Sequence, residues 1–158
     1  LAWTAEYLSE WYGIPAPELD ETERTVAAAV LWLLRGDAAQ RAVVAWNVAQ
    51  EGARQAAGDF AMVPFLANAL KDEYSAVRYV AAEALRRFPG YADLQYDYLS
   101  EPARRAAAAG QVVGHWERAH GRSERRRELL RAPGGGPDLD AIDALLRARD
   151  HTPIWIIE

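Results

Sequence analysis

Residues 64–88 read PFLANALKDEYSAVRYVAAEALRRF, and this stretch decides the fold. A proline opens its first half, and Asp72 and Glu73 mark a turn before its second half. The apolar residues of the second half recur at the spacing of one helix face: Val77, Val80, Ala81, Ala84, Leu85 and Phe88. This spacing predicts two helices joined by a tight turn.

The same helical hairpin occurs twice in the chain, at an offset of 37 residues. The offset aligns these pairs: Val26 with Val63, Ala29 with Leu66, Leu33 with Leu70, Arg41 with Arg78, Val43 with Val80, Val44 with Ala81 and Val48 with Leu85. One offset can align both helices only if the connections also have equal length. Because a single hairpin cannot bury its apolar face, we expect the two copies to stack.

The second copy resembles a HEAT repeat through the pattern PxLxxxLxD followed by VRxxAAxAL. Among the residues that carry this pattern are Pro64, Leu66, Leu70, Asp72, Val77, Arg78, Ala81, Ala82 and Leu85. The first copy matches less closely, because it lacks the proline and has its aspartate later in the turn. The resemblance implies that turn aspartates and second-helix arginines bond between neighbouring repeats. It therefore assigns structural roles to Asp37, Arg41, Asp72 and Arg78.

Composition favours an all-α domain without covalent staples. The chain has 158 residues, which suits one domain, and its hydrophobic residues are rich in alanine, a strong helix former. It contains no cysteine, which excludes disulfides, thiolate metal ligands and covalent haem attachment within this chain. A formal charge of −5 disfavours a general polyanion binder. No run of about 18 apolar residues occurs, so no membrane span is expected.

We therefore predict a short α-solenoid of HEAT-like hairpins with divergent capping helices, formed by the whole chain as a single domain. Its parts are an N-terminal cap (1–20), a first repeat (21–50), a second repeat (59–88), a divergent third unit (100–131) and a C-terminal helix with its tail (138–158). Adding 37 to Arg78 reaches His115, so the repeat does not continue in register. Solenoids need such atypical end units.

Local signals predict the helix boundaries within these parts. Residues 21–34 are expected as one helix with acids in its first turn, and residues 51–60 as a linker. Trp11 and Tyr12 are expected to pack on the first hairpin. The expected N-caps are Asp37, Asp59, Ser100 and Asp138. The last helix, 139–149, is expected to bury Leu139, Ile142, Leu145 and Leu146.

Two aromatic stretches are the candidate interaction sites. In the first, after the second repeat, Tyr91, Tyr96 and Tyr98 alternate with Asp93 and Asp97. Such loops bind partners or, more commonly, cover helix ends. The second is the C-terminal tail, whose isoleucines and tryptophan are too apolar to remain in solvent. The candidate interaction residues are Tyr91, Tyr96, Tyr98, Trp155 and Ile156.

Five arginines lie close together near the end of the third unit: Arg122, Arg125, Arg126, Arg127 and Arg131. They could bind phosphate groups of a nucleic acid. Glu124 and Glu128 interleave at helical spacing, however, and no aromatic residue that could stack on bases lies among them. A solvated, ion-paired helix face is therefore the favoured interpretation, and no nucleic-acid partner is expected.

The histidines do not form a recognisable metal site. His115, His120 and His151 make no H-E-x-x-H motif and no pair at i, i+4. We expect His115 to be a hydrogen-bonded helix residue, with ligation of a metal or of a haem from another domain as the weaker alternative. The sequence thus assigns no catalytic, cofactor-binding or metal-binding residue.

The order of the segments is similar to that of one further family. WYGIPAP, GDAAQRAVVAW, AVRYVAAEALRRFPGY and RARDHTPIWIIE follow one another in the chain. This order resembles the HEAT-like C-terminal region of some bacterial extracytoplasmic multihaem c-type cytochromes, which end in a similar Arg-Asp-x-x-Pro tail. The chain departs from that family because it has no C-x-x-C-H. The resemblance implies that any haem c belongs to an upstream region, and it implies a periplasmic or extracellular location.

Three functions follow as hypotheses. The favoured one is a non-catalytic scaffold that serves electron transfer by binding a protein partner or a covalently attached cytochrome domain. The second is a HEAT-like enzyme or cofactor-handling domain that uses Asp93 or Asp97, within the Tyr91–Tyr98 loop, as acid or base. The third is a weak nucleic-acid binder that uses residues 122–131.

Overall fold

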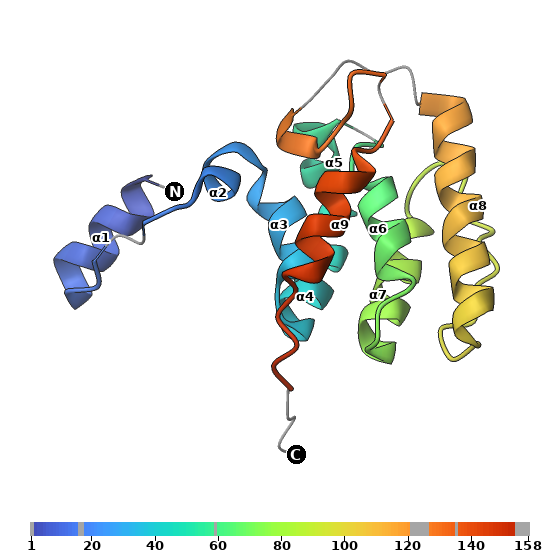
Figure 1. Ribbon diagram of the computed structural model, residues 1–158, viewed down its shortest axis with the longest axis horizontal. Coiled ribbons are helices and arrows are strands. Elements are labelled where there is room, and N and C mark those ends of the chain that lie inside the picture. The colour runs from blue at the N-terminus through green and yellow to red at the C-terminus, as the bar shows by residue number, and fades with distance from the viewer. Residues whose placement is uncertain (1, 16–17, 59, 121–126, 135, 154–158) are drawn as a thin grey trace.

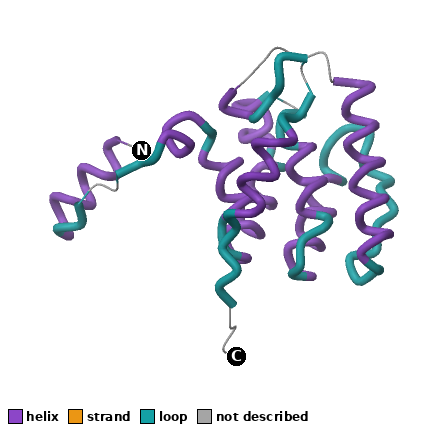
Figure 2. The backbone as a smooth tube through the Cα atoms, viewed as in Figure 1, coloured by secondary structure: helices purple, strands orange, loops and turns teal. Residues whose placement is uncertain are grey.

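The structure is a computed structural model that describes residues 2–15, 18–58, 60–120, 127–134 and 136–153. Within these ranges the chain is all-α and forms no β-strand, as Figures 1 and 2 show. The helices are α1 (Ala2–Tyr12), α2 (Glu21–Thr25), α3 (Ala28–Arg35), α4 (Ala38–Val48), α5 (Glu51–Ala57), α6 (Val63–Ala69), α7 (Ser75–Leu85), α8 (Pro102–His120) and α9 (Leu139–Arg147), with a 3-10 turn η1 (Arg127–Leu129).

Two helical hairpins form the centre of the molecule, α3 with α4 and α6 with α7. They lie side by side, because α4 packs along α7 and α3 packs along α6 (Figure 1). An offset of 37 residues maps the first and last residues of α4 onto those of α7. The buried side chains of the two hairpins include Val30, Leu33, Leu34, Val63, Leu66, Leu70, Ala81 and Leu85. Burial of this apolar surface is the main term that stabilises the pair.

Helices α8 and α9 pack against the hairpins. Helix α8 packs on α6, and its buried Trp116 donates an indole hydrogen bond to the Phe60 carbonyl at 2.8 Å. Helix α9 packs on α3 and buries Ile142 and Leu145. The predicted burial of Leu139 was wrong, because this side chain is 67% exposed at the first turn of α9.

The region predicted as one helix, residues 21–34, forms two. Helix α2 begins with a capping box between Asp20 and Glu23, and the chain becomes extended at Val26. The amide of Ala27 donates to the carbonyl of Glu128 at 2.9 Å instead of continuing the helix. A contact with a distant segment therefore overrides the local helix propensity.

The predicted linker at 51–60 also differs, because it contains helix α5. Gly52 lies in the first turn of α5, and Gly58 ends the helix with φ of +90°, a conformation that suits glycine. The two glycines therefore mark the ends of a helix rather than a loop. The predicted cap at Asp59 lies outside the described residues.

The remaining predicted caps have different outcomes. The carboxylates of Asp37 and Asp138 accept hydrogen bonds from the amides of Gln40 and Ala141, so both N-caps are confirmed. The hydroxyl of Ser100 donates to the carbonyl of Asp97 at 2.7 Å, so Ser100 serves the preceding turn.

Helix α1 projects away from the hairpins (Figure 1). The predicted packing of Trp11 and Tyr12 on the first hairpin was wrong, because these side chains are 67% and 71% exposed. Trp11 instead contacts the ring of Tyr7, one turn earlier, at a centroid distance of 4.7 Å. Among the described residues, no helix combines the length and apolar content that a membrane crossing requires.

Candidate functional site

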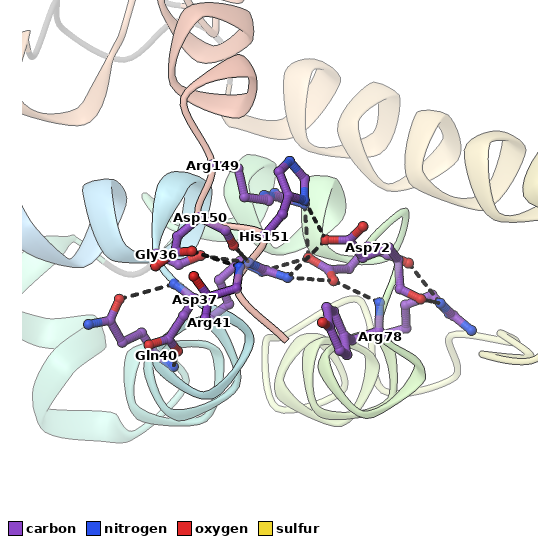
Figure 3. Close-up of polar contacts among 12 residues, drawn as sticks. Gly36, Asp37, Gln40, Arg41, Asp72, Arg78, Arg149, Asp150 and His151 are labelled. Atoms are coloured by element: carbon purple, nitrogen blue, oxygen red, sulfur yellow. Dashed lines mark hydrogen bonds and ion pairs between the residues drawn. The ribbon is translucent and has the colours of Figure 1, made fainter. Parts of the chain in front are cut away.

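The turn between α6 and α7 contains a buried carboxylate that several arginines surround (Figure 3). Asp72 is 1% exposed, and Arg41 of α4 is fully buried beside it. The Arg41 Nε and Nη2 atoms lie 2.8 and 3.0 Å from the two Asp72 carboxylate oxygens. Arg149 adds a second ion pair, with Nη1 at 3.0 Å from Asp72 Oδ2. The carboxylate thus joins the first hairpin, the second hairpin and the C-terminal segment.

Two further arginines bind the backbone of the same turn. Arg78 Nη1 donates to the carbonyls of Asp72 and Glu73 at 2.8 and 2.7 Å. Arg78 Nε donates to the carbonyl of Tyr98 at 2.6 Å, which connects α7 to the loop before α8. Arg105 of α8 reaches the Asp72 carbonyl at 3.3 Å. Four guanidinium groups therefore converge on one turn.

Arg41 and Arg78 make the same local contact in the two hairpins. Each donates through Nη1 to the carbonyl five residues earlier, Gly36 at 2.6 Å and Glu73 at 2.7 Å. The carboxylate has no counterpart, because Arg35 occupies the position 37 residues before Asp72. The duplicated contact fixes each turn, whereas the Asp72 ion pairs occur once.

The C-terminal residues 149–151, which we call the C-terminal strap, cross both turns. Arg149 Nε donates to the Leu34 carbonyl at 2.9 Å, and the Asp150 amide donates to the Arg35 carbonyl at 2.8 Å. His151 Nδ1 lies 2.8 Å from Glu73 Oε1. Burial lowers the pKa of Arg149, and the Asp72 carboxylate opposes this shift. The strap therefore closes the cluster from the outside.

This geometry suits a structural brace. The Asp72 oxygens are occupied by Arg41, Arg149 and the amide of Tyr74. A carboxylate that is buried among cations in this way has no open side for a substrate. The predicted inter-repeat roles correspond to the positions of Arg41 and Asp72. The contacts of Asp37, in contrast, are local to α4, where this residue is the N-cap.

The three tyrosines of the candidate loop take different positions. Tyr91 is 4% exposed and packs edge-to-face on His115, with centroids 5.1 Å apart, which does not fit the interaction role predicted for it. Burial raises its pKa to about 12, partly opposed by Arg118, and its hydroxyl has no hydrogen-bond partner among the described residues. Tyr96 is half-buried and donates to the Leu70 carbonyl.

Tyr98 is the loop tyrosine that borders a surface. Its ring contacts the half-exposed ring of Tyr79 on α7 at 5.4 Å between centroids. Asp93 and Asp97 are exposed, and a carboxylate oxygen of Asp97 accepts from the Leu99 amide. The other predicted interaction residues, Trp155 and Ile156, lie outside the described residues.

The arginines considered as phosphate ligands and the histidines considered as metal ligands lie on α8 or after it in the chain. Arg131 is buried, with its guanidinium 5.0 Å from the centroid of Trp116, whereas residues 121–126 lie outside the described ranges. His115 is exposed beside Tyr91, and His120 stacks on Phe60 at 3.8 Å between centroids. Within the described part of the chain, no three His, Asp or Glu side chains gather as metal ligands would.

An exposed apolar groove runs between α4 and α7, and the periodicity analysis missed it. We call this surface the α4/α7 face; its lining residues are Ala42, Val43, Trp46, Asn47 and Val80. Val43 is 59% and Trp46 45% exposed. The helical spacing of Val43 gave no signal of this exposure, because spacing does not show whether another element covers a face.

A cation borders one end of the α4/α7 face. The guanidinium of Arg87 lies over the ring of Trp46, 3.9 Å from its centroid. Arg87 also donates to the side-chain oxygen of Gln50 at 3.2 Å. This contact holds Trp46 and Arg87 together across the ends of the two helices.

Comparisons with known proteins identify no relative. No protein-family model, no curated protein and no solved structure matches the chain. The function must therefore be argued from the geometry of this chain and from the resemblances of its sequence.

Proposed function

We propose that the chain is a non-catalytic scaffold, a short α-solenoid of HEAT-like hairpins with divergent end helices, that binds a protein partner through the α4/α7 face. The observation that carries the proposal is the exposure of Val43 and Trp46 in an apolar groove. Exposed apolar grooves with a polar rim are typical of protein-binding surfaces. Tryptophan and arginine, here Trp46 and Arg87, are the residue types that contribute most often to interface hot spots.

The buried cluster supports this proposal, because it fixes the two sides of the groove. Arg41 lies on α4, and Asp72 lies in the turn that leads into α7. Their ion pair restricts sliding of α4 along α7. A preformed groove loses less conformational entropy when a partner binds, which favours affinity.

The resemblance to multihaem c-type cytochromes suggests the class of partner. On this proposal the scaffold holds a cytochrome domain, either covalently attached or separate, in a periplasmic or extracellular electron-transfer assembly. Haem and its redox chemistry belong to that domain. The segment order and the Arg149-Asp150 tail pattern support this part of the proposal.

The alternative functions lack a supporting arrangement among the described residues. Asp93 and Asp97 are exposed rather than set in a groove with a second catalytic group. Arg131 packs in the interior over the ring of Trp116. We therefore develop only the scaffold function.

Binding of a soluble multihaem c-type cytochrome to the ¹⁵N-labelled chain tests the proposal by NMR. Amide shifts are expected to cluster on α4 and α7, and Val43→Glu is expected to weaken binding at least about tenfold. The control is Trp32→Glu, a change at a similarly exposed position on α3. Shifts that cluster on other helices would contradict the α4/α7 face, and absence of binding at millimolar cytochrome would contradict the cytochrome partner.

A further inference from the structure

Helix α1 carries a second apolar surface that the body of the protein leaves exposed. We call residues 2–14 the α1 arm. Five of its large hydrophobic side chains are between 40% and 71% exposed: Tyr7, Leu8, Trp11, Tyr12 and Ile14. An isolated helix of 11 residues is marginal in water, so its stability depends on packing against another surface.

The α1 arm lies apart from the α4/α7 groove of its own chain (Figure 1). Helix α1 extends from the side of α3 and α4 that is turned away from α7, whereas the groove lies between α4 and α7. An arm that points away from its own groove can reach the same groove on another molecule.

Charge complementarity favours the groove as the docking site. The α1 arm contains two acids, Glu6 and Glu10, and no lysine or arginine. The groove has an apolar lining and ends at the exposed Arg87. An acidic helix with aromatic side chains thus meets an apolar groove with a basic end.

We infer that the α1 arm of one copy docks in the α4/α7 groove of a second copy. Two copies that each place an arm in the groove of the other form a closed, two-fold symmetric dimer, whereas one-way contacts would build an open chain. Trp11 enters the groove between Val43 and Val80, and Glu10 faces Arg87 of the other copy. This inference rests on the role proposed for the α4/α7 face, and the arm and the protein partner compete for that face.

Sedimentation velocity of the full chain over a concentration series tests the inference. The wild-type chain, with a monomer mass of 17.5 kDa, is expected to form a dimer. Trp11→Glu on the arm and Val43→Glu in the groove are each expected to raise the dimer Kd at least about tenfold. The matched control, Trp32→Glu, changes another exposed tryptophan and is expected to leave the Kd unchanged. Circular dichroism of each variant verifies that it is folded.

A mixing experiment separates arm exchange from other dimers. The Trp11→Glu copy keeps an intact groove, and the Val43→Glu copy keeps an intact arm. Their equimolar mixture therefore restores one of the two arm contacts, and dimers are expected to reappear on mixing. Glu10→Arg is expected to weaken the dimer, and combining it with Arg87→Glu is expected to restore it.

Three results would overturn the inference. They are a monomer at all concentrations, a dimer that Trp11→Glu leaves intact, and variants whose mixture forms no dimer. A wild-type monomer that still binds a cytochrome through α4 and α7 would overturn this inference alone. A dimer that obeys the mixing rule supports the inference, and a Trp11→Glu chain, whose groove is free, that binds no cytochrome would contradict the cytochrome partner.

Discussion

At the scale of single residues, Asp72 connects parts of the chain that are far apart in sequence. Its carboxylate binds Arg41, 31 positions earlier, and Arg149, 77 positions later. Removal of an ion from water costs several kcal/mol, which these ion pairs offset. Turn chemistry and the HEAT-like pattern indicated Arg41 and Asp72. No local signal pointed to Arg149, because a contact over that separation leaves no periodicity in the sequence.

Asp72→Ala is expected to lower the free energy of unfolding by about 3–5 kcal/mol. The reason is that Arg41 would remain buried without its carboxylate partner. Urea unfolding followed by circular dichroism measures the change. Asp37→Ala, which removes the N-cap of α4, is the control and is expected to cost about 1 kcal/mol. Equal costs for the two variants would contradict the brace assigned to Asp72.

Removal of the side-chain hydroxyl is expected to change the stability of the fold in opposite directions at Tyr91, which is buried, and at Tyr96, which is half-buried. Tyr91→Phe is expected to be neutral or to stabilise by up to about 1 kcal/mol, because the buried hydroxyl has no partner among the described residues. Tyr96→Phe removes the hydrogen bond to the Leu70 carbonyl and is expected to cost about 1 kcal/mol. Thermal unfolding of both variants tests this, and a larger loss for Tyr91→Phe would show that its hydroxyl has a role.

At the scale of elements, helix ends with a local chemical signal could be predicted, and those set by distant contacts could not. The caps at Asp37 and Asp138 were readable because an N-cap depends on residues within one turn. The break between α2 and α3 could not be predicted, because it depends on the hydrogen bond from the Ala27 amide to the distant Glu128 carbonyl. The two glycines that bound α5 suggested a linker because glycine marks helix ends and loops alike.

Two helix glycines are expected to respond oppositely to alanine. At Gly36, which ends α3, a Cβ would lie 2.6 Å from the Trp32 carbonyl oxygen, and Gly36→Ala is expected to cost about 1–3 kcal/mol. At Gly110, inside α8, a Cβ meets no atom within 4 Å. Gly110→Ala is expected to stabilise by about 1 kcal/mol through helix propensity. Differential scanning calorimetry compares the variants, and a stabilising Gly36→Ala would contradict the described turn.

The stability of the fold is expected to depend on pH through His120, the last residue of α8. Burial against Phe60 lowers the pKa of His120, and His115 and Arg131 lower it further. The unfolded chain therefore takes up this proton first. The stability from neutral His120 is complete above about pH 6.5 and is lost as the pH falls toward the lower pKa of the folded state.

The test compares urea unfolding at pH 7.5 and pH 5.5. His120→Gln is expected to reduce the loss of stability on acidification. His115→Gln is expected to retain most of the loss, because burial is the larger cause of the shift. Identical pH profiles for the wild type and His120→Gln would show that another group is responsible.

At the scale of the whole molecule, the all-α class and the pair of hairpins followed from periodicity and from the offset of 37 residues. The exposed surfaces did not follow from either of these signals. A helical pattern shows which residues share a face, but it does not show whether another element covers that face. Val43 and Trp11 are both apolar at helical spacing, and both are exposed because nothing in the described body covers them.

The strap is expected to open when Arg149 is replaced. Arg149→Met removes the ion pair with Asp72 and the hydrogen bond to the Leu34 carbonyl. Hydrogen exchange of the Asp150 amide, which donates to the Arg35 carbonyl, is expected to accelerate about tenfold or more. Arg147→Met, at an exposed position on α9, is the control and is expected to leave this exchange unchanged. Equal exchange in both variants would mean that Arg149 does not hold the strap.

The strap also has a consequence for the order of folding. Its bond from Arg149 to the Leu34 carbonyl closes a loop over a sequence separation of 115 residues, whereas each hairpin forms from near neighbours. Loop closure over such a distance is entropically costly and slow, so the strap belongs to the late steps. During synthesis both hairpins leave the ribosome before Arg149 exists. The pair of Arg41 and Asp72, with a separation of 31 residues, is therefore expected to form before Arg149 joins it.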